Sequence, residues 1–219
     1  MKKNTDTIKK IQKAAFKEFF EKGYMKASLR KICSDAGVTT GALYFFFKDK
    51  DELFCSLVRG VVDEIKSVML EHFALEQNIK EKDFIEALIG EGAGKEDFKA
   101  LSDITDIMYK NRDLVLLLLT KAQGSSLENV VDVFIDLSTK QYETLSDKMS
   151  KAFPNKSISK YFAHWVAHDQ VQALVYAITH IENEDEAMIY ISNMILYLRG
   201  GWCSVWIPEA FKNNIDNFK

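Results

Sequence analysis

The sequence predicts an all-α protein, and three observations support this fold class. The chain of 219 residues has only two prolines, Pro154 and Pro208, so long stretches are free to form helices. No run of β-branched residues alternates with polar residues as in a strand. Apolar residues recur instead at spacings of three and four. We therefore expect about nine helices, and a chain of this length can bury a sizeable core as one or two domains.

The first predicted helix covers residues 5–22. Ile8, Ile11, Ala15 and Phe19 recur at helical spacing and form one apolar stripe, while four lysines lie mostly outside it. Gly23 is expected to end this helix. Its apolar stripe should supply most of the core of the N-terminal domain.

Two short helices joined by a tight turn follow, over residues 28–47. Ser28 is a natural N-cap, because its hydroxyl can accept a backbone N–H of the first turn. Gly37 ends the first of the pair, since glycine adopts the left-handed conformation without a steric clash. Thr39 can cap the second. This order of short helix, glycine turn and short helix is typical of a helix-turn-helix.

The second short helix has an outward side suited to a DNA major groove. Small residues at its start allow close approach and hydrogen bonding, and aromatic and basic residues follow. We expect base-edge or methyl contacts from Thr40 and Tyr44, and phosphate contacts from Ser28, Thr39 and Lys48. The full set of candidate DNA-binding residues is Ser28, Thr39, Thr40, Gly41, Tyr44, Phe45 and Lys48.

Charge is distributed unevenly along the chain. Residues 1–50 contain twelve Lys/Arg and five Asp/Glu, a balance of +7, whereas the remaining residues carry a balance of −10. A basic first quarter on an acidic body indicates that one end meets a polyanion. A membrane surface or a merely solvated basic face are the alternatives, and the helix-turn-helix in the same fifty residues favours nucleic acid.

The N-terminal pattern resembles the DNA-binding domain of the TetR family of transcriptional regulators. The resemblance covers roughly residues 5–60 and rests on Ile11, Ala14, Ala15, Phe19, Gly23, Tyr24, Ser28, Leu29, Ile32, Ala36, Gly37, Val38, Gly41, Leu43, Tyr44, Phe47, Lys50 and Leu53. It implies a three-helix DNA-binding domain at residues 1–50 and a regulatory and dimerisation domain at residues 51–219. It also implies a homodimer in which the last two helices of each copy form a four-helix interface.

The remaining chain reads as a series of helices. Asp49 and Glu52 make a capping-box-like start to a connecting helix over residues 49–73, which can act as a rigid strut. Residues 90–95 are glycine-rich, but they lack the glycine and hydroxyl positions of a phosphate-binding loop and are expected to form a flexible connection. Further helices are expected at 98–109, 113–123, 127–153, 159–181 and 186–206, the last ended by Pro208.

A second candidate site lies on the predicted helix over residues 159–181. Tyr161, Trp165, His168 and Gln172 share one stripe, and the opposite stripe is apolar, so we expect this helix to lie between a packed interface and a cavity. Aromatic linings with few polar groups are typical of small-molecule pockets. The alternative is an ordinary core helix. Met108 and Tyr109 are further candidate ligand-binding residues by position.

The sequence gives little support for other chemistry. His164 and His168 have metal-ligand spacing on a helix, but no cysteine or carboxylate joins them locally except Asp169, which is expected to point elsewhere, so no metal site is predicted. No Ser/His/Asp arrangement is apparent, so we expect no catalytic residues, no cofactor and no enzyme activity. Cys33, Cys55 and Cys203 are expected to be buried and free. With no signal segment or apolar run of membrane-spanning length, we expect a cytoplasmic protein that does not bind membranes.

Together these features predict a ligand-responsive DNA-binding regulator. Two copies would place their second short helices in successive major grooves of a palindromic double-stranded operator, about 34–36 Å apart. A small apolar or aromatic effector bound in the body would release the DNA, as in a repressor. Two alternatives remain open: a DNA-binding protein controlled by a protein partner, and a helical enzyme or carrier with a fortuitous helix-turn-helix.

Overall fold

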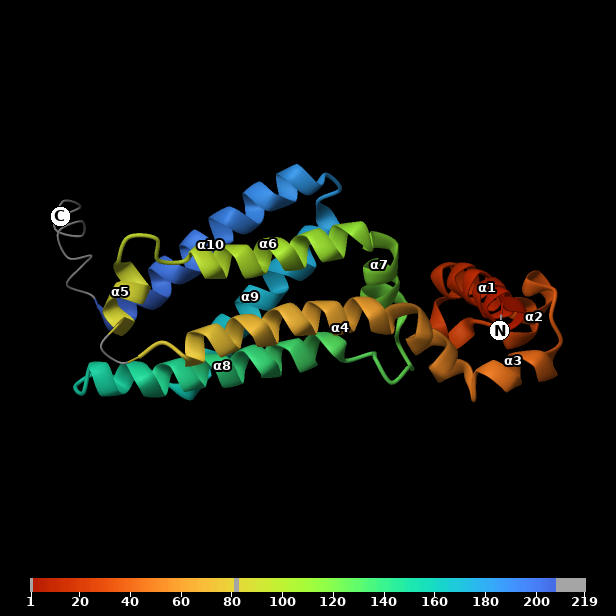
Figure 1. The fold of residues 1–219 in the computed structure, drawn as a ribbon, viewed down its shortest axis with the longest axis horizontal. Coiled ribbons are helices and arrows are strands. Elements are labelled where there is room, and N and C mark those ends of the chain that lie inside the picture. Colours follow the sequence, from red (N-terminus) through yellow and green to blue (C-terminus); the bar gives the residue numbers. More distant parts are fainter. Residues whose placement is uncertain (1, 81–82, 208–219) are drawn as a thin grey trace. The chain divides into compact units, whose positions relative to one another are not determined.

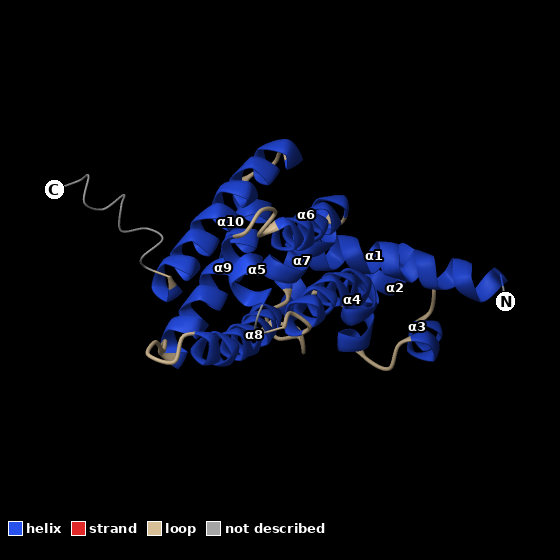
Figure 2. Cartoon of the chain, turned by 60° about the vertical axis from the view of Figure 1, so that its left-hand side comes forward, coloured by secondary structure: helices blue, strands red, loops and turns tan. Residues whose placement is uncertain are grey.

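The computed structural model describes residues 2–80 and 83–207, and every regular element in these ranges is a helix (Figures 1 and 2). The helices are α1 (Lys2–Lys26), α2 (Leu29–Ala36), α3 (Thr40–Phe46), α4 (Lys50–Gln77), α5 (Phe84–Ile89), α6 (Lys95–Lys110), α7 (Arg112–Lys121), α8 (Val130–Ala152), α9 (Lys160–His180) and α10 (Glu184–Trp206). The predicted all-α class is confirmed. The expected number of about nine helices omitted α5, whose six residues are too few to show a clear period.

The chain divides into two compact units, and α4 contributes residues to both. The first unit comprises residues 1–64 and 110–130, and the second comprises residues 65–109 and 131–219. The first unit therefore holds α7 together with α1, α2 and α3. The predicted division at residue 50 separates a DNA-binding domain from a regulatory domain, and it stays a prediction.

An aromatic and aliphatic core holds the first unit together. α1 packs against both α2 and α7. Ile11, Phe19, Ile32 and Leu43 are completely buried, as the apolar spacing predicted. The rings of Phe19 and Phe54 meet edge to face with centroids 5.2 Å apart. This core fixes α3 through its inward residues and leaves its other side free for contacts.

Gly23 ends the regular part of α1, as predicted. Its φ of 74° and ψ of 159° are non-helical, and the turn that follows to Lys26 is a separate short segment across this kink. A side chain at this φ would be strained, which explains why glycine suits the position.

Aromatic side chains form the core of the second unit. Phe84, Met149, Val166, Trp202 and Trp206 pack together, and Trp206 is completely buried. α9 and α10 lie against each other through a second apolar cluster. The side chain of Ser159 caps α9 and that of Asn183 caps α10. Pro208, the expected end of the last helix, lies outside the described residues.

Several helix boundaries differ from those expected. α4 continues to Gln77 rather than residue 73, and α8 begins at Val130 rather than residue 127. The glycine-rich connection before α6 forms turns, in which Gly92 and Gly94 both have positive φ, and its expected flexibility stays a prediction. Ser126 precedes residue 127 as a possible cap, but its hydroxyl donates to Asp51 at 2.7 Å, and residues 126–129 form turns before α8 begins.

Candidate nucleic-acid interface and regulatory residues

Side-chain caps and a left-handed glycine define the turn between α2 and α3. The Ser28 hydroxyl accepts the Lys31 N–H at 3.4 Å, and the Thr39 hydroxyl accepts the Ala42 N–H at 3.1 Å. Gly37 has φ 66° and ψ 35°, and its N–H is donated to carbonyls of α2. These three features confirm the predicted helix-turn-helix.

α3 has one side buried in the core and one side exposed to solvent. Leu43 is completely buried and Phe47 is 6% exposed, so the inward side of the helix is firmly anchored. On the outward side Tyr44 is 52% exposed and Phe45 is 76% exposed. All seven candidate DNA-binding residues lie on the surface: Ser28, Thr39, Thr40, Gly41, Tyr44, Phe45 and Lys48. The geometry therefore suits a groove, and the contacts themselves stay a prediction.

The start of α4 confirms the predicted capping box in a modified form. The Asp49 carboxylate accepts the Glu52 N–H at 2.8 Å. Glu52 in turn accepts the N–H of Lys48, rather than that of Asp49, at 2.6 Å. This bond fixes the backbone of Lys48 directly after α3. The exposed side chain of Lys48 therefore extends from a fixed position.

A polar network joins the start of α4 to the residues after α7 within the first unit. Asp51 accepts the Ser126 N–H at 2.8 Å and the Ser126 hydroxyl at 2.7 Å. Burial alone would raise the pKa of the Asp51 carboxyl, but these bonds outweigh burial and hold that pKa below its usual value. Burial raises the pKa of the neighbouring Cys55 thiol. Asp51 is therefore ionised when it holds Ser126.

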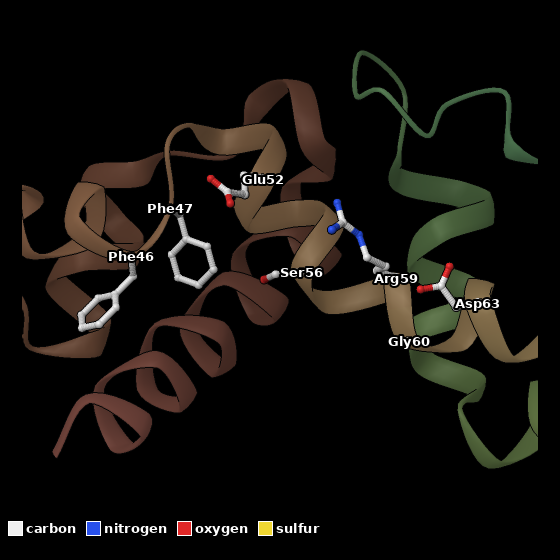
Figure 3. Close-up of a pocket in the computed structure, with 7 residues that line it drawn as sticks. All are labelled: Phe46, Phe47, Glu52, Ser56, Arg59, Gly60 and Asp63. Atoms are coloured by element: carbon white, nitrogen blue, oxygen red, sulfur yellow. The ribbon is translucent and has the colours of Figure 1, made fainter. Parts of the chain in front are cut away.

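An open pocket of about 380 Å³ lies beside α3 in the first unit (Figure 3). Phe46 and Phe47 line one side of it, and Arg59 and Asp63 of α4 line the other, with Glu52, Ser56 and Gly60 between them. None of the candidate ligand-binding residues lines this pocket. Its charged lining differs from the apolar lining expected for an effector site.

The expected inward orientation of the α9 stripe is wrong. Tyr161 is 75% exposed, Trp165 is 49% exposed and His168 is also exposed, whereas Gln172 is half-buried. The opposite side of α9, including Val166 and Ala177, is buried. Both sides carry large apolar groups, so periodicity did not show which side faces the core.

Met108 and Tyr109 belong to the second unit, and their expected contact with a ligand stays a prediction. Met108 is 6% exposed. The Tyr109 hydroxyl donates to the carbonyls of Ala177 and Ile181, at 3.0 and 2.8 Å. Tyr109 thereby connects the end of α6 to the C-terminal end of α9, a structural role that sequence reasoning did not predict.

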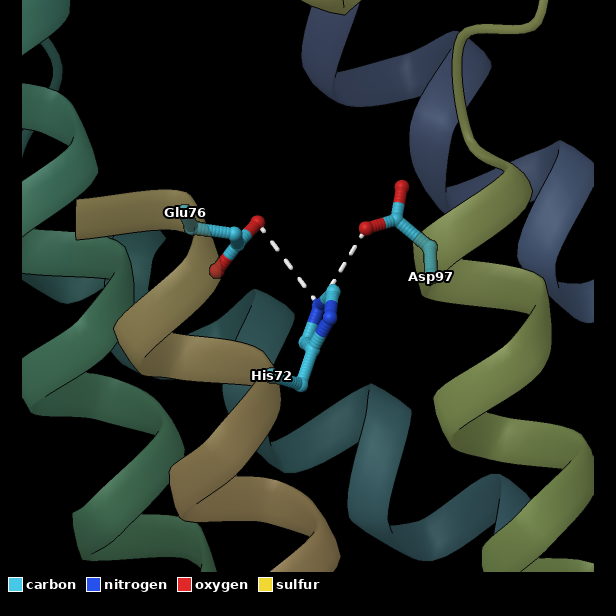
Figure 4. Close-up of side chains that lie close together, drawn as sticks. All are labelled: His72, Glu76 and Asp97. Atoms are coloured by element: carbon cyan, nitrogen blue, oxygen red, sulfur yellow. Dashed lines mark ion pairs between the residues drawn. The ribbon is translucent and has the colours of Figure 1, made fainter. Parts of the chain in front are cut away.

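Sequence reasoning missed a half-buried polar cluster in the second unit (Figure 4). His72 Nε2 lies 3.2 Å from Asp97 Oδ1 and 3.8 Å from Glu76 Oε1. Arg199 pairs with the other oxygen of Asp97 and donates to the Leu88 carbonyl at 2.7 Å. The only local signal was the spacing of four between His72 and Glu76, because the other members come from distant segments.

Charge and burial compete in this cluster. Burial alone would lower the pKa of His72, but the hydrogen bond to Asp97 and the charge of Glu76 outweigh it and raise that pKa. Burial raises the pKa of Glu76. For Asp97 the effect of burial is overcome by His72 and Arg199, which lower its pKa. The cluster therefore holds closely coupled charges away from bulk water.

The three cysteines lie where the sequence predicted. Cys33, Cys55 and Cys203 are free and buried. His164 and His168 are exposed on α9, and His164 Nδ1 lies 3.1 Å from the Thr139 hydroxyl.

Within residues 2–80 and 83–207, no helix is both long and apolar enough to cross a bilayer.

Comparison with known proteins connects this geometry to a family of regulators. Residues 11–57, which contain α2, α3 and the start of α4, match the family described as "Bacterial regulatory proteins, tetR family". The chain is 30% identical over 82 residues to the fatty acid metabolism regulator protein of Bacillus subtilis (strain 168), covering 37% of this chain and 42% of that protein. It is 36% identical over 66 residues to the HTH-type transcriptional repressor BepR of Brucella suis biovar 1 (strain 1330), covering 30% and 32%. The matches thus span less than half of these relatives.

Solved structures extend the likeness to the whole fold. NalD, the secondary repressor of the MexAB-OprM multidrug efflux pump in Pseudomonas aeruginosa, superposes with a TM-score of 0.57 at 17% identity, covering 90% of this chain and 97% of that one. The fatty acid degradation regulator FadR from Bacillus halodurans gives a TM-score of 0.52 at 18% identity, covering 88% and 98%. Residues 11–57 of this chain thus match the DNA-binding domain of the tetR family, and the fold of the chain is similar to those of these two solved structures.

Proposed function

We propose that the chain is a transcriptional repressor that binds a palindromic operator in double-stranded DNA and releases it when a small effector binds. The observation that carries this proposal is the exposed outward side of α3 on a firmly packed base. Tyr44 and Phe45 offer apolar surface for thymine methyl groups, and Thr40 offers a hydroxyl for base edges. A protein with this role would act in the cytoplasm, where the operator is.

Fluorescence anisotropy with labelled operator DNA tests this role. Tyr44→Ala should weaken binding by roughly 1–3 kcal/mol, about 5- to 150-fold, and more for the operator than for random DNA. Lys48→Ala should weaken binding to both DNAs alike and reduce the salt dependence by about one charge. Phe98→Ala and Lys140→Ala, exposed residues of α6 and α8, serve as matched controls. Unchanged affinity in both test variants would refute the groove assignment.

We further propose that the repressor is a homodimer joined through α9 and α10. Exposed apolar side chains gather on these two helices: Tyr161, Trp165, Tyr176, Ile189, Leu196 and Tyr197. Apolar groups in this number on one surface favour burial against a partner. Leu196→Glu should therefore give a folded monomer with weakened operator binding, because Leu196 is 71% exposed and needed only for association.

Light scattering coupled to gel filtration measures the association state directly. Leu75→Glu, at a 54% exposed position of α4, is the matched control and should remain dimeric. A Leu196→Glu protein that still dimerises would refute this interface. A wild-type monomer would refute the dimer altogether.

The effector is proposed to be small and apolar or aromatic. The names of three similar proteins support this class. Two are regulators of fatty acid metabolism or degradation, and the third is a repressor of a multidrug efflux pump. Met108, Tyr109 and Gln172 are the candidate contacts that lie at least partly inside the second unit. A long-chain fatty acid and a hydrophobic aromatic dye are suitable probes, and at saturation one should lower operator affinity. If neither ligand at saturation changes that affinity, control by a protein partner becomes the better hypothesis.

A further inference from the structure

The cluster on α4 and α6 brings three metal-ligand types to one point. His72 and Glu76 lie one turn apart on α4, and Asp97 comes from the first turn of α6 (Figure 4). One ligand atom from each of the three lies within 4.8 Å of the others. The side chains of His72, Glu76 and Asp97 are 13%, 20% and 23% exposed, so the three groups are largely withdrawn from solvent.

The two carboxylates use their oxygens differently. Glu76 Oε2 accepts the Gln141 side-chain N–H at 2.6 Å, while its Oε1 lies towards His72. Asp97 Oδ2 pairs with Arg199, while its Oδ1 lies towards His72. In each case one oxygen is held by an outer partner and the other is directed at the imidazole. Outer partners of this kind orient the ligands in metal sites.

We propose that His72 Nε2, Glu76 Oε1 and Asp97 Oδ1 bind a divalent transition-metal ion in the second unit. Bonds of about 2.0–2.2 Å from a tetrahedral ion place neighbouring ligand atoms roughly 3.3–3.5 Å apart. The imidazole nitrogen already lies 3.2 and 3.8 Å from the two carboxylate oxygens. Small side-chain movements therefore suffice to enclose the ion.

The ligand set selects the class of metal. One imidazole nitrogen with two carboxylate oxygens suits Zn²⁺, Co²⁺, Fe²⁺ or Mn²⁺. Ca²⁺ takes six to eight oxygen ligands, and this cluster offers two. Three protein ligands leave at least one position for water. With the imidazole neutral, the two carboxylates and Arg199 sum to one negative charge, which attracts a divalent cation.

The chain also has a competing surface pair that the experiment must separate. His164 and His168 lie four residues apart on α9 and are both exposed. A surface pair with this spacing can chelate a metal whatever the function of the protein. The proposed site differs in being largely buried and in requiring carboxylates. Removing the α9 pair should leave it unaffected, and neutralising a carboxylate should remove it.

Co²⁺ and Zn²⁺ are the probes, added to metal-free full-length protein without DNA. Co²⁺ binding is followed by its visible absorption, and Zn²⁺ affinity by competition with a chelating dye. We expect one ion per chain in the wild type and in the His164→Ala/His168→Ala double variant. Glu76→Gln and Asp97→Asn should each weaken binding at least tenfold. Gln141→Leu, which removes an outer partner, should weaken it about 10- to 100-fold.

Circular dichroism identifies variants that retain the helical fold, and the two conservative carboxylate variants provide independent tests. Absence of bound Co²⁺ in the wild type would overturn the proposal. So would binding that survives both carboxylate variants or disappears in the double histidine variant. The readout needs no operator DNA, so its failure is distinct from failure of the proposed repressor function.

Discussion

Asp51→Asn is the sharpest test of the polar network in the first unit. The wild-type carboxylate accepts two hydrogen bonds from Ser126, at 2.8 and 2.7 Å, and lies in the first turn of α4. Asparagine keeps the shape, removes the charge and replaces one acceptor oxygen with a donor. The contacts of a single side chain are therefore changed while the packing around it stays the same.

The expected loss of stability follows from these contacts. Hydrogen bonds to charged groups contribute about 1.5–3 kcal/mol each and neutral ones about 0.5–1.5 kcal/mol. A carboxylate in a first helical turn adds roughly 0.3–1 kcal/mol. Since Asp51 is partly exposed to water, the lower ends of these ranges apply. We expect Asp51→Asn to lower the free energy of unfolding by about 2 kcal/mol at pH 7.

Urea unfolding followed by circular dichroism, at one fixed protein concentration, measures this loss. Because the folded pKa of Asp51 is lowered, its contribution is fully present above the unfolded pKa of about 4. It disappears as the pH falls through the folded pKa. The difference between wild type and variant should thus be constant above about pH 5 and shrink below pH 4.

Two comparisons make the test decisive. Asp63→Asn, at an exposed position of the same helix, should change stability by less than about 0.5 kcal/mol. A double-mutant cycle with Ser126→Ala should show a coupling of about 1 kcal/mol or more. Additive effects of the two variants, or an Asp51→Asn loss no larger than that of the control, would refute the reasoning.

Three further variants test the first unit by the same unfolding assay. Thr39→Ala removes the cap of α3 and should cost about 1 kcal/mol, whereas Thr39→Ser should cost little; equal losses would contradict the cap. Leu43→Ala creates a cavity at a completely buried position and should cost about 2–5 kcal/mol; a loss below 1 kcal/mol would contradict its place in the core. Gly37→Ala forces a side chain to φ 66° and should cost about 1 kcal/mol, more than Gly60→Ala, where an added Cβ meets nothing within 4 Å.

Sequence reasoning succeeded where the signal was local. The caps at Ser28 and Thr39 and the left-handed Gly37 depend on a few neighbouring residues, so their positions could be predicted. The buried sides of α1 and α3 also followed from apolar spacing. In α1 the lysines lie mostly outside the apolar stripe, so its buried side was clear from the sequence.

The errors arose where tertiary contacts decide. α9 carries large apolar or aromatic groups on both sides, so its spacing did not distinguish the core from the surface, and Tyr161 and Trp165 proved exposed. The cluster at His72 depends on Asp97 and Arg199, which only the packing of α6 and α10 brings close. No spacing rule predicts such a meeting of distant segments.

The Thr39 hydroxyl can serve the start of α3 and an outside partner at the same time. Its oxygen accepts the Ala42 N–H at 3.1 Å, and the residue is exposed, so its hydroxyl proton can still be donated to an anion at the surface. Thr39→Asp would keep an acceptor for the helix start but replace that donor with a negative charge. Thr39→Asp should thus leave the stability of α3 nearly unchanged while it lowers the affinity for a polyanion.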